Sequence, residues 1–384
     1  MNEIKYFDHA ATTPLSREVL DAMMPWLTDN FGNASSVYSI GRTARAAVDE
    51  ARAQVAKAIN AKEKEIYFTA GGSEGDNTLI KGVAMAKRAK GNHIITSKIE
   101  HPAVLETCKQ LEKEGFEVTY LEVNGEGKIS IDDLKAAIKP ETVLITIMFA
   151  NNEIGSIQPI AEIGAIAREH KILFPTDAVQ AVGNVPVDVK AMNIDLLSMS
   201  AHKFYGPKGV GAMYIRTGVV VDKLIAGGHQ EKGKRAGTEG LANIMGMAKA
   251  LEISRDRMGE AKELAAKRDR LIKGITSLPD TYLTGHPTDR LPGNASFVFK
   301  GIEGESLLFL LSAAGICGST GSACSSASLE PSHVLTSMGI PVEICHGSLR
   351  LSICYETTDE DIDYMIENVK KVVERLRMMS PIYN

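Results

Sequence analysis

The chain has 384 residues, of which 44% are hydrophobic, and its formal net charge is −5. This length is sufficient for two domains with sizeable cores, and the acidic balance argues against a general nucleic-acid-binding surface. No uninterrupted apolar run approaches 18 residues and the first residues lack a signal pattern, so we expect a soluble, cytoplasmic protein without a membrane segment. The five cysteines are widely spaced, and neither a CxxC pair nor an HExxH motif is present. We therefore expect neither a disulfide framework nor a metal site.

From about residue 60, short apolar runs alternate with longer amphipathic ones. The runs that predict strands are 66–68, 93–96, 117–122, 143–149, 172–176, 196–199 and 210–215. The stretches that predict helices between many of them are 74–89, 103–114, 131–138 and 159–170. This alternation is typical of βαβ units and predicts a largely parallel sheet with helices on both faces.

The last third of the chain has a different pattern. Residues 238–276 predict one long connecting helix or two, because apolar positions recur at helical spacing among Ala, Glu, Lys and Arg. Beyond them, two strands at 295–299 and 347–353 flank a helix at 305–314, and a final helix covers 359–379 after the capping residues Thr357 and Thr358. The complete pattern predicts a large α/β domain over residues 15–260. A smaller α+β domain would combine residues 1–14 with residues 261–384.

A glycine-rich segment, Gly71-Gly72-Ser73-Glu74-Gly75, leads from a predicted strand into a predicted helix. The free N–H groups at the start of that helix would accommodate a phosphate at Gly72 and Ser73. The same letters match the GxSxG nucleophile elbow of serine hydrolases, with Ser73 as the nucleophile, although no HGGG-type oxyanion segment accompanies them. A purely structural glycine turn is the third interpretation, and all three remain open at this point.

Asp177 and Lys203 each follow a predicted strand, at the sheet edge where α/β proteins bind their ligands. A lysine acts as a nucleophile only when neutral, and at a pKa of about 10.4 roughly 0.04% is neutral at pH 7. Ser200, His202 and Lys203 form a polar cluster suited to an anionic cofactor, whereas a solvated lysine beside the turn at 206–209 is the alternative. Asp177 would either cap a helix or pair with the pyridinium nitrogen of pyridoxal phosphate.

Two further polar residues are ambiguous on their own. His101 precedes Pro102 at the start of a predicted helix, and a lone histidine is usually only a satisfied polar group. Arg350 alternates with apolar neighbours in the predicted strand 347–353. It would lie either at a sheet edge or against an anion, and its planar guanidinium suits a substrate carboxylate.

Cys324 differs from the other cysteines because small residues surround it from 318 to 328. Such a segment offers little to bury a thiol against, so we expect Cys324 on an exposed, mobile loop. At a free pKa of about 8.5, roughly 3% of such a thiol is thiolate at pH 7, and modest stabilisation makes it a competent nucleophile. Cys108 lies at helical spacing from Val104 and Leu111 and predicts a buried, inert thiol. The remaining cysteines, near apolar runs, are also expected in the core: Cys317, Cys345 and Cys354.

Taken in order, these motifs resemble the pyridoxal-phosphate-dependent cysteine desulfurases of the NifS and IscS type, from residue 8 to residue 363. The segments that carry the resemblance are Asp8-His-Ala-Ala-Thr-Thr13, Glu100-His-Pro-Ala-Val-Leu105, Asn151-Asn-Glu-Ile-Gly155, Asp177-Ala-Val-Gln180, Ser200-Ala-His-Lys203, Gly227-Gly-His-Gln-Glu231, Arg235-Ala-Gly-Thr238 and Thr357-Thr-Asp-Glu-Asp-Ile-Asp363. The resemblance implies an aspartate-aminotransferase-like fold, with the large domain binding the cofactor, and a homodimer. It also implies conversion of L-cysteine to L-alanine, with the sulfur carried as a persulfide on Cys324 to an iron–sulfur scaffold or another acceptor protein.

By position, the resemblance assigns Lys203 to the covalent bond with the cofactor, Asp177 to the pyridine nitrogen, and His101 to ring stacking and proton transfer. Asn152 and Gln180 would lie on the ring hydroxyl side. The phosphate would be bound by Gly72, Ser73, Ser200 and His202, together with Thr238 of the partner subunit. The substrate carboxylate would be bound by Arg350 and Asn152.

Some positions depart from the family pattern. Gly72-Ser73 replaces a common Ala-Thr, and Asn33-Ala-Ser-Ser36 has alanine where proline is common. Ile353-Cys-Tyr355 differs from the usual residues after the arginine strand, which affects the expected shape of the substrate pocket. The alternatives to a cysteine desulfurase are a selenocysteine lyase or related carbon–sulfur lyase, a serine hydrolase using Ser73, and a non-catalytic sulfur-transfer scaffold.

Overall fold

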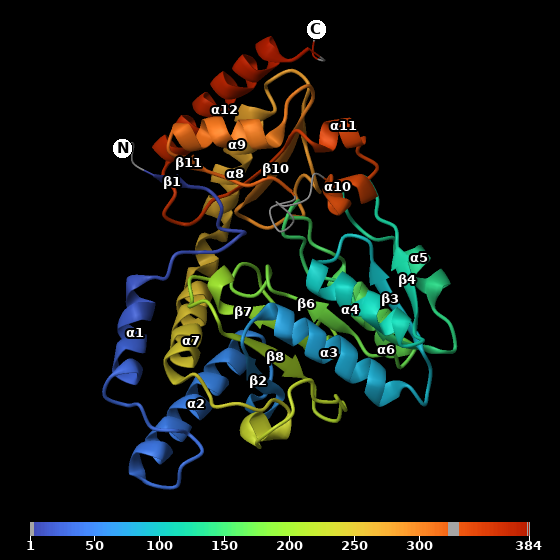
Figure 1. The fold of residues 1–384 in the computed structure, drawn as a ribbon, viewed down its shortest axis with the longest axis vertical. Coiled ribbons are helices and arrows are strands. Elements are labelled where there is room, and N and C mark those ends of the chain that lie inside the picture. Colours follow the sequence, from blue (N-terminus) through green and yellow to red (C-terminus); the bar gives the residue numbers. More distant parts are fainter. Residues whose placement is uncertain (1–3, 322–329, 382, 384) are drawn as a thin grey trace.

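The computed structural model describes residues 4–321, 330–381 and 383, and it has two bodies of different size (Figure 1). The larger body is built on a sheet whose strands run in the order β2, β8, β7, β6 and, in a second group, β4, β3, β5. Their bounds are β2 Ile66–Thr69, β3 His93–Ser97, β4 Glu117–Leu121, β5 Thr142–Ile145, β6 Pro175–Asp177, β7 Leu196–Ser200 and β8 Gly211–Ile215. A parallel bridge between Leu144 and Leu173 joins the two groups.

All neighbouring strands of this sheet are parallel except at β8, which runs antiparallel to both β2 and β7. The connection from β7 to β8 is short, and a parallel pair would need a long crossover. The prediction of a largely parallel sheet is therefore confirmed, with β8 as the exception.

Helices cover both faces of this sheet. On one face, α3 (Gly72–Lys87) and α4 (Pro102–Lys113) pack on the strand residues Ile94, Leu196 and Met213. The next residues along the same strands, Ile95, Leu197 and Tyr214, face the opposite core. This alternation is the two-residue period of a strand buried on both sides. The helices that supply side chains to the opposite core are α1 (Arg17–Leu27), α2 (Ser39–Ala58), α6 (Ile160–Glu169) and α7 (Leu241–Asp256).

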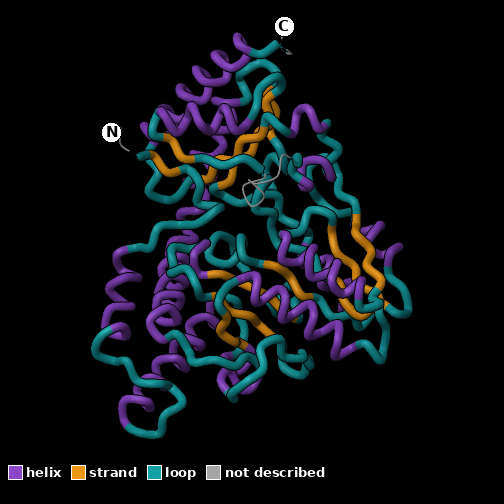
Figure 2. The backbone as a smooth tube through the Cα atoms, viewed as in Figure 1, coloured by secondary structure: helices purple, strands orange, loops and turns teal. Residues whose placement is uncertain are grey.

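The smaller body combines the two ends of the chain, and both termini lie on it (Figure 2). Its antiparallel sheet has the order β12, β10, β9, and β1 pairs in parallel with β11. The strand bounds are β1 Lys5–Tyr6, β9 Thr281–Leu283, β10 Asn294–Phe299, β11 Ile316–Cys317 and β12 Ser348–Ser352. The helices here are α8 Ala261–Ile275, α9 Gly304–Ala313, α10 His333–Ser337, α11 Val342–Cys345 and α12 Asp359–Met379. The α+β character agrees with the predicted small domain, whose boundaries stay a prediction.

The remaining helices are short. They are α5 Ile131–Ala137 and the 3-10 helices η1 Glu63–Glu65, η2 Ala201–Lys203, η3 Gln230–Gly233 and η4 Arg257–Glu260. The sequence predicted one long helix or two over residues 238–276. Two helices are confirmed, because η4 separates α7 from α8. Thr358 caps α12 as predicted, accepting a hydrogen bond from the Asp361 backbone while the Asp361 carboxylate accepts one from the Thr358 backbone.

The predictions about membrane segments and about buried cysteines can be compared with the structure. Among the described residues, no helix combines the length and apolar character needed to cross a membrane. Cys108 and Cys345 are buried as expected, and the described cysteines are free thiols. Cys317 and Cys354 are only partly buried, so the expectation that they lie in the core was wrong. Cys317 ends β11, and Cys354 lies in the loop between β12 and α12.

Candidate active site

A cavity of about 310 Å³ lies where the carboxyl ends of β6 and β7 meet the starts of α3 and α4. It is lined by Ala10, Ala11, Gly72, Ser73, Asp76, His101, Met148, Asn152, Asp177, Val179, Gln180, Ser200, His202, Lys203 and Arg350. Every described residue that the sequence assigned to the site is among them except Thr238, which is exposed and lies elsewhere. Cys324 lies outside the described residues. The structure therefore brings together residues from 72 to 350, whose individual roles stay predictions.

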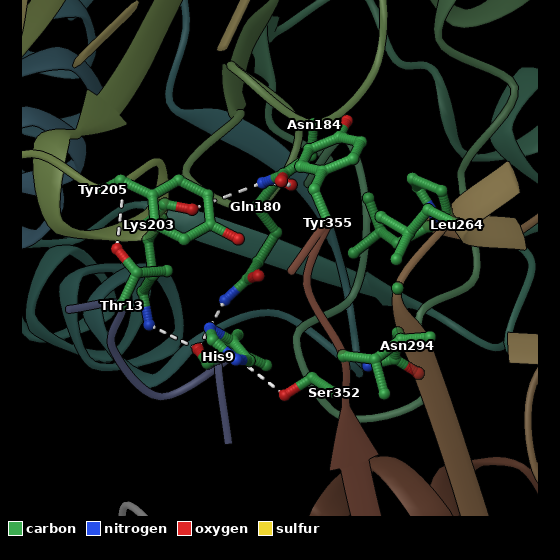
Figure 3. Close-up of a pocket in the computed structure, with 15 residues that line it drawn as sticks. His9, Thr13, Gln180, Asn184, Lys203, Tyr205, Leu264, Asn294, Ser352 and Tyr355 are labelled. Atoms are coloured by element: carbon green, nitrogen blue, oxygen red, sulfur yellow. Dashed lines mark hydrogen bonds between the residues drawn. The ribbon is translucent and has the colours of Figure 1, made fainter. Parts of the chain in front are cut away.

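Lys203 ends η2, directly after β7, and its amine is held by the N-terminal segment of the chain. The Nζ atom donates hydrogen bonds to the backbone carbonyls of Ala10, at 2.6 Å, and Ala11, at 2.8 Å. Gln180 donates to the same Ala10 carbonyl at 3.0 Å. Figure 3 shows these side chains converging from different elements beside a smaller cavity of about 40 Å³. Tyr355, one of the departures from the family pattern, lines that smaller cavity rather than the larger one.

Asp177 and His101 form the polar floor of the larger cavity. Asp177 ends β6, and its carboxylate accepts a hydrogen bond from the Val179 backbone at 2.9 Å. Burial raises the pKa of Asp177, while the nearby His101 and Lys203 oppose that shift. A cationic ring nitrogen placed here would stabilise the carboxylate in the same way.

His101 is the N-cap residue of α4, where its Nδ1 accepts a hydrogen bond from the Ala103 backbone at 3.1 Å. An accepting Nδ1 carries no proton, so the neutral ring holds its proton on Nε2. Burial lowers the pKa of His101, which favours this neutral form at pH 7. The helix cap therefore sets which ring nitrogen is available as a donor to a ligand.

The opposite end of the cavity has the chemistry of a phosphate site. Gly72 and Ser73 open α3, whose first N–H groups have no partners within the helix. His202 binds Thr12 through Nδ1 at 3.1 Å, and burial, followed by the charges of Lys203 and Lys208, lowers its pKa from 6.5 to about 4. A neutral His202 can donate one hydrogen bond to an anion without carrying charge itself.

Arg350 closes the cavity from the smaller body. It lies on β12, the outer strand of its sheet as one alternative expected, and is only 4% exposed. Its Nη1 donates to the backbone carbonyl of Asn152 at 3.1 Å, and its Nη2 forms an ion pair with Asp8 at 2.8 Å. These partners orient the guanidinium at the edge of the cavity that contains Lys203. A carboxylate is the ligand that such a guanidinium recognises best.

Comparisons with known proteins agree with this geometry. The family model described as "Aminotransferase class-V" matches residues 5–365. The chain is 57% identical to "Cysteine desulfurase IscS" of Methanosarcina thermophila, over 99% of this chain and 95% of that protein. It is also 57% identical to the protein of the same name in Clostridium botulinum strain Hall, over 100% of this chain and 98% of that protein. The chain belongs to the class V aminotransferase family, in its cysteine desulfurase branch.

Solved structures of class V enzymes show the same fold. A "NIFS-LIKE PROTEIN" superimposes with a TM-score of 0.91 at 37% identity, covering 98% of this chain and 100% of that chain. A second structure, "SspA in complex with cysteine", has a TM-score of 0.81 at 38% identity and covers 91% of this chain and 98% of that chain. The aspartate-aminotransferase-like α/β fold implied by the sequence is therefore confirmed.

Pyridoxal phosphate is the cofactor of this class V enzyme, and the residues present fit it. The start of α3 with Ser73 and the neutral His202 would suit its phosphate, Asp177 would suit its ring nitrogen, and Lys203 would supply the amine for its covalent bond. The serine-hydrolase alternative has no comparable support, because no hydrogen bond between Ser73 and a histidine is found in the described part of the chain.

The sequence predictions missed two acidic residues of the site. Asp76, on α3, is buried and hydrogen-bonds Ser198, and its ligand atom lies within 4.8 Å of those of His101 and Asp177. That spacing would also suit a metal ion, so the expectation of no metal stays a prediction. Burial, and then the charge of Asp177, raises the pKa of Asp76 well above its usual value. The sequence signal that could have found Asp76 is its position four residues after Gly72, which places both residues on the same face of the helix.

Asp8, the second missed residue, belongs to a segment that carried the family resemblance without an assigned role. Its partner Arg350 is 342 residues away in the sequence, so no local pattern could have paired them.

Proposed function

We propose that this enzyme converts L-cysteine into L-alanine and transfers the sulfur to Cys324. The observation that carries the proposal is the convergence of Lys203, Asp177 and Arg350 on one cavity. An amine, a partner for the ring nitrogen and a carboxylate-binding guanidinium are what an amino-acid substrate on pyridoxal phosphate requires. The structure named "SspA in complex with cysteine", similar over 91% of this chain, supports cysteine as the substrate.

Arg350 and Asn152 would bind the substrate carboxylate and so present the Cα–H bond to Lys203. When bound, pyridoxal phosphate supplies an electron sink for the charge that develops at Cα. The Lys203 amine would take the Cα proton and become an ammonium group. The carbonyls of Ala10 and Ala11 would stabilise that ammonium, because they already accept hydrogen bonds from Nζ at 2.6 and 2.8 Å.

The Cys324 thiolate would then attack the substrate sulfur. An S–S bond forms, the Cβ–S bond breaks, and the electron pair of the broken bond remains with the carbon skeleton, which takes up protons to become alanine. The net reaction turns one cysteine and one Cys324 thiol into one alanine and one Cys324 persulfide. Three other cysteines are poor substitutes, since burial raises the pKa of Cys108 to about 12, of Cys345 to about 11, and also that of Cys354.

We further propose that the enzyme works as a homodimer in the cytoplasm and passes its persulfide to an iron–sulfur scaffold or another acceptor protein. Large apolar side chains are exposed at and after the end of α1, as a protein interface requires: Leu27, Phe31, Val37 and Tyr38. The exposed Thr238 would reach the phosphate of the partner subunit. The name IscS carried by relatives at 57% identity supports a role in iron–sulfur assembly.

The decisive experiment measures alanine release and persulfide formation on Cys324 with the same enzyme. The purified enzyme with pyridoxal phosphate and L-cysteine should release alanine in amounts equal to sulfide when a thiol reductant is present. In the absence of reductant, mass spectrometry should find one added sulfur atom on the Cys324 peptide. Cys324→Ser should keep the cofactor absorbance and lose sulfide release, whereas Cys108→Ser should keep both. A Cys324→Ser variant with full activity would refute the assignment, and a strong preference for selenocysteine would favour the lyase alternative.

A further inference from the structure

Glu153 is a buried acidic residue that has no place in the mechanism above. It follows Asn152 in the segment between β5 and α6, is 6% exposed, and does not line the cofactor cavity. Its backbone N–H donates to Asn151 Oδ1 at 2.8 Å, which fixes the turn that also places Asn152 against Arg350. A buried carboxyl group is costly unless hydrogen bonds or charges compensate it, so its partners indicate its purpose.

The first partner of Glu153 is Ser332, immediately before α10. The Ser332 hydroxyl donates to Glu153 Oε2 at 2.5 Å. The same hydroxyl oxygen caps α10 by accepting from the backbones of Val334, at 3.2 Å, and Leu335, at 3.3 Å. Because both lone pairs of the oxygen are occupied, its single proton is committed to Glu153.

Gly321 lies close to the same oxygen. A Cβ atom at position 321 would lie 2.6 Å from Glu153 Oε2 and 3.2 Å from Ser332 Cβ. A side chain at this position would therefore require the Glu153 carboxyl to move. The Gly321 backbone also donates to the Ser348 hydroxyl at 3.3 Å, two residues before Arg350. Glu153 thus binds Ser332 and lies close to Gly321 beside the residues proposed to bind the substrate carboxylate.

Gly321 and Ser332 stand on either side of Cys324 in the sequence. Neither residue lines the cofactor cavity, yet the Glu153 carboxylate beside the turn that contains Asn152 hydrogen-bonds one and lies close to the other. A further hydrogen bond strengthens this attachment, because His333 Nε2 lies 3.0 Å from the carbonyl oxygen of Glu100, the residue before His101. The chain after Cys324 is therefore hydrogen-bonded to the two turns that carry Asn152 and His101, and Gly321 before it lies close to Glu153.

We propose that Glu153 is a positioning residue for sulfur transfer: by hydrogen-bonding Ser332 and lying against Gly321, it helps to hold the described chain on both sides of Cys324 beside the turn that contains Asn152. This inference rests on the proposed function of Cys324. The surroundings of the Glu153 carboxyl fit such a structural role. Burial raises its pKa to about 7, while the Ser332 hydrogen bond and the charge of Arg350 lower it.

The test replaces Glu153 by a residue of similar size that cannot accept a hydrogen bond. Glu153→Leu should lower the single-turnover rate of Cys324 persulfide formation by about tenfold or more, since it removes a charge-assisted hydrogen bond. Glu153→Gln keeps an acceptor oxygen and should retain most of that rate. Cofactor affinity, KM for cysteine and the rate of Cys324 alkylation by iodoacetamide should stay near their original values, because neither the cavity nor the thiol changes.

Two further variants keep the proposal falsifiable. Ser332→Ala removes the same hydrogen bond from the other side, and Glu153→Leu with Ser332→Ala should be no slower than Glu153→Leu alone. Glu65→Leu is the matched control, because Glu65 is a buried carboxylate that accepts from the Thr217 hydroxyl at 2.6 Å and is not among the cavity-lining residues. Its persulfide rate should be unchanged.

An unchanged persulfide rate in Glu153→Leu would overturn the proposal. If that variant does not fold, an unchanged rate in Ser332→Ala would overturn it. Absence of a persulfide on Cys324 in the original enzyme would instead refute the proposed function itself.

Discussion

Gly72 and Val179 face each other at the phosphate end of the cavity, and a Cβ atom at position 72 would lie only 2.5 Å from Val179 Cγ2. Alanine, the common family residue at this position, therefore does not fit here unless Val179 moves. The small residue on α3 and the branched residue after β6 are complementary in size, as close-packed interiors require.

This pair leads to a prediction about cofactor affinity. Gly72→Ala should weaken pyridoxal phosphate binding by about tenfold, because overpacking of this kind typically costs about 1–3 kcal/mol and displaces the start of α3. Val179→Ala in the same chain should restore the affinity by removing the clashing methyl group. Fluorescence titration of the apoenzyme with the cofactor measures both effects. Equal affinities of Gly72→Ala and the original protein would show that Val179 moves without cost.

Arg350→Lys should raise KM for cysteine by about 10-fold to 100-fold while changing kcat less. A lysine has no planar guanidinium, so it cannot bind the Asn152 carbonyl, Asp8 and a substrate carboxylate together. Steady-state alanine formation gives the two constants. A drop in kcat at unchanged KM would assign Arg350 to the chemical step instead of to substrate binding.

Asp76→Asn should leave cofactor binding almost unchanged, because burial and the charge of Asp177 raise the pKa of the Asp76 carboxyl and so favour its neutral form. The folded pKa lies above the unfolded value, so the stability that Asp76 contributes at low pH is lost as the pH rises toward the folded pKa. The substitution should therefore raise the free energy of unfolding at pH 8 more than at pH 4, as denaturant titrations at the two pH values would measure. Asp177→Asn is the contrasting variant and should lose most activity.

The contribution of His202 to stability should depend on pH in the opposite direction from that of Asp76. Its folded pKa of about 4 lies below the usual 6.5, so the unfolded chain binds more protons between these values. Its contribution to stability is complete above pH 6.5 and is lost as the pH falls toward 4. His202→Asn should remove about 1 kcal/mol of this acid sensitivity, after allowing for solvent screening at a partly exposed group. Denaturant unfolding at pH 7 and pH 4.5 would measure it, with the exposed His229 substituted as the control.

The sequence alone predicted most of the strands and helices between residues 66 and 379 because their apolar residues recur with the period of each element, but it missed β9, β11, α10 and α11. It missed α1 and α2 for identifiable reasons. Pro25 interrupts the pattern of α1, and the buried stripe of α2 consists largely of alanines such as Ala44, Ala47 and Ala51. Alanine favours helix formation but contributes little to a hydrophobic period.

The site residues were predictable where they end strands or start helices, as Asp177, Lys203 and Ser73 do. Asp8, Asp76 and Glu153 were not, because their partners are 342, 122 and 179 residues away. Only the folded chain brings such pairs together. The contact of Glu153 with Ser332 also depends on how the smaller body sits against the larger one, which no local pattern encodes.

The late position of Arg350 in the sequence also sets an order of events during synthesis of the chain. A ribosome adds about 5–20 residues per second, so Arg350 follows Lys203 by on the order of ten seconds. During this interval the nascent chain already has Lys203 and the residues proposed to bind the phosphate, but the guanidinium proposed to bind the substrate carboxylate is not yet made. The residues proposed to hold the cofactor are therefore synthesised before the residue proposed to hold the amino-acid substrate.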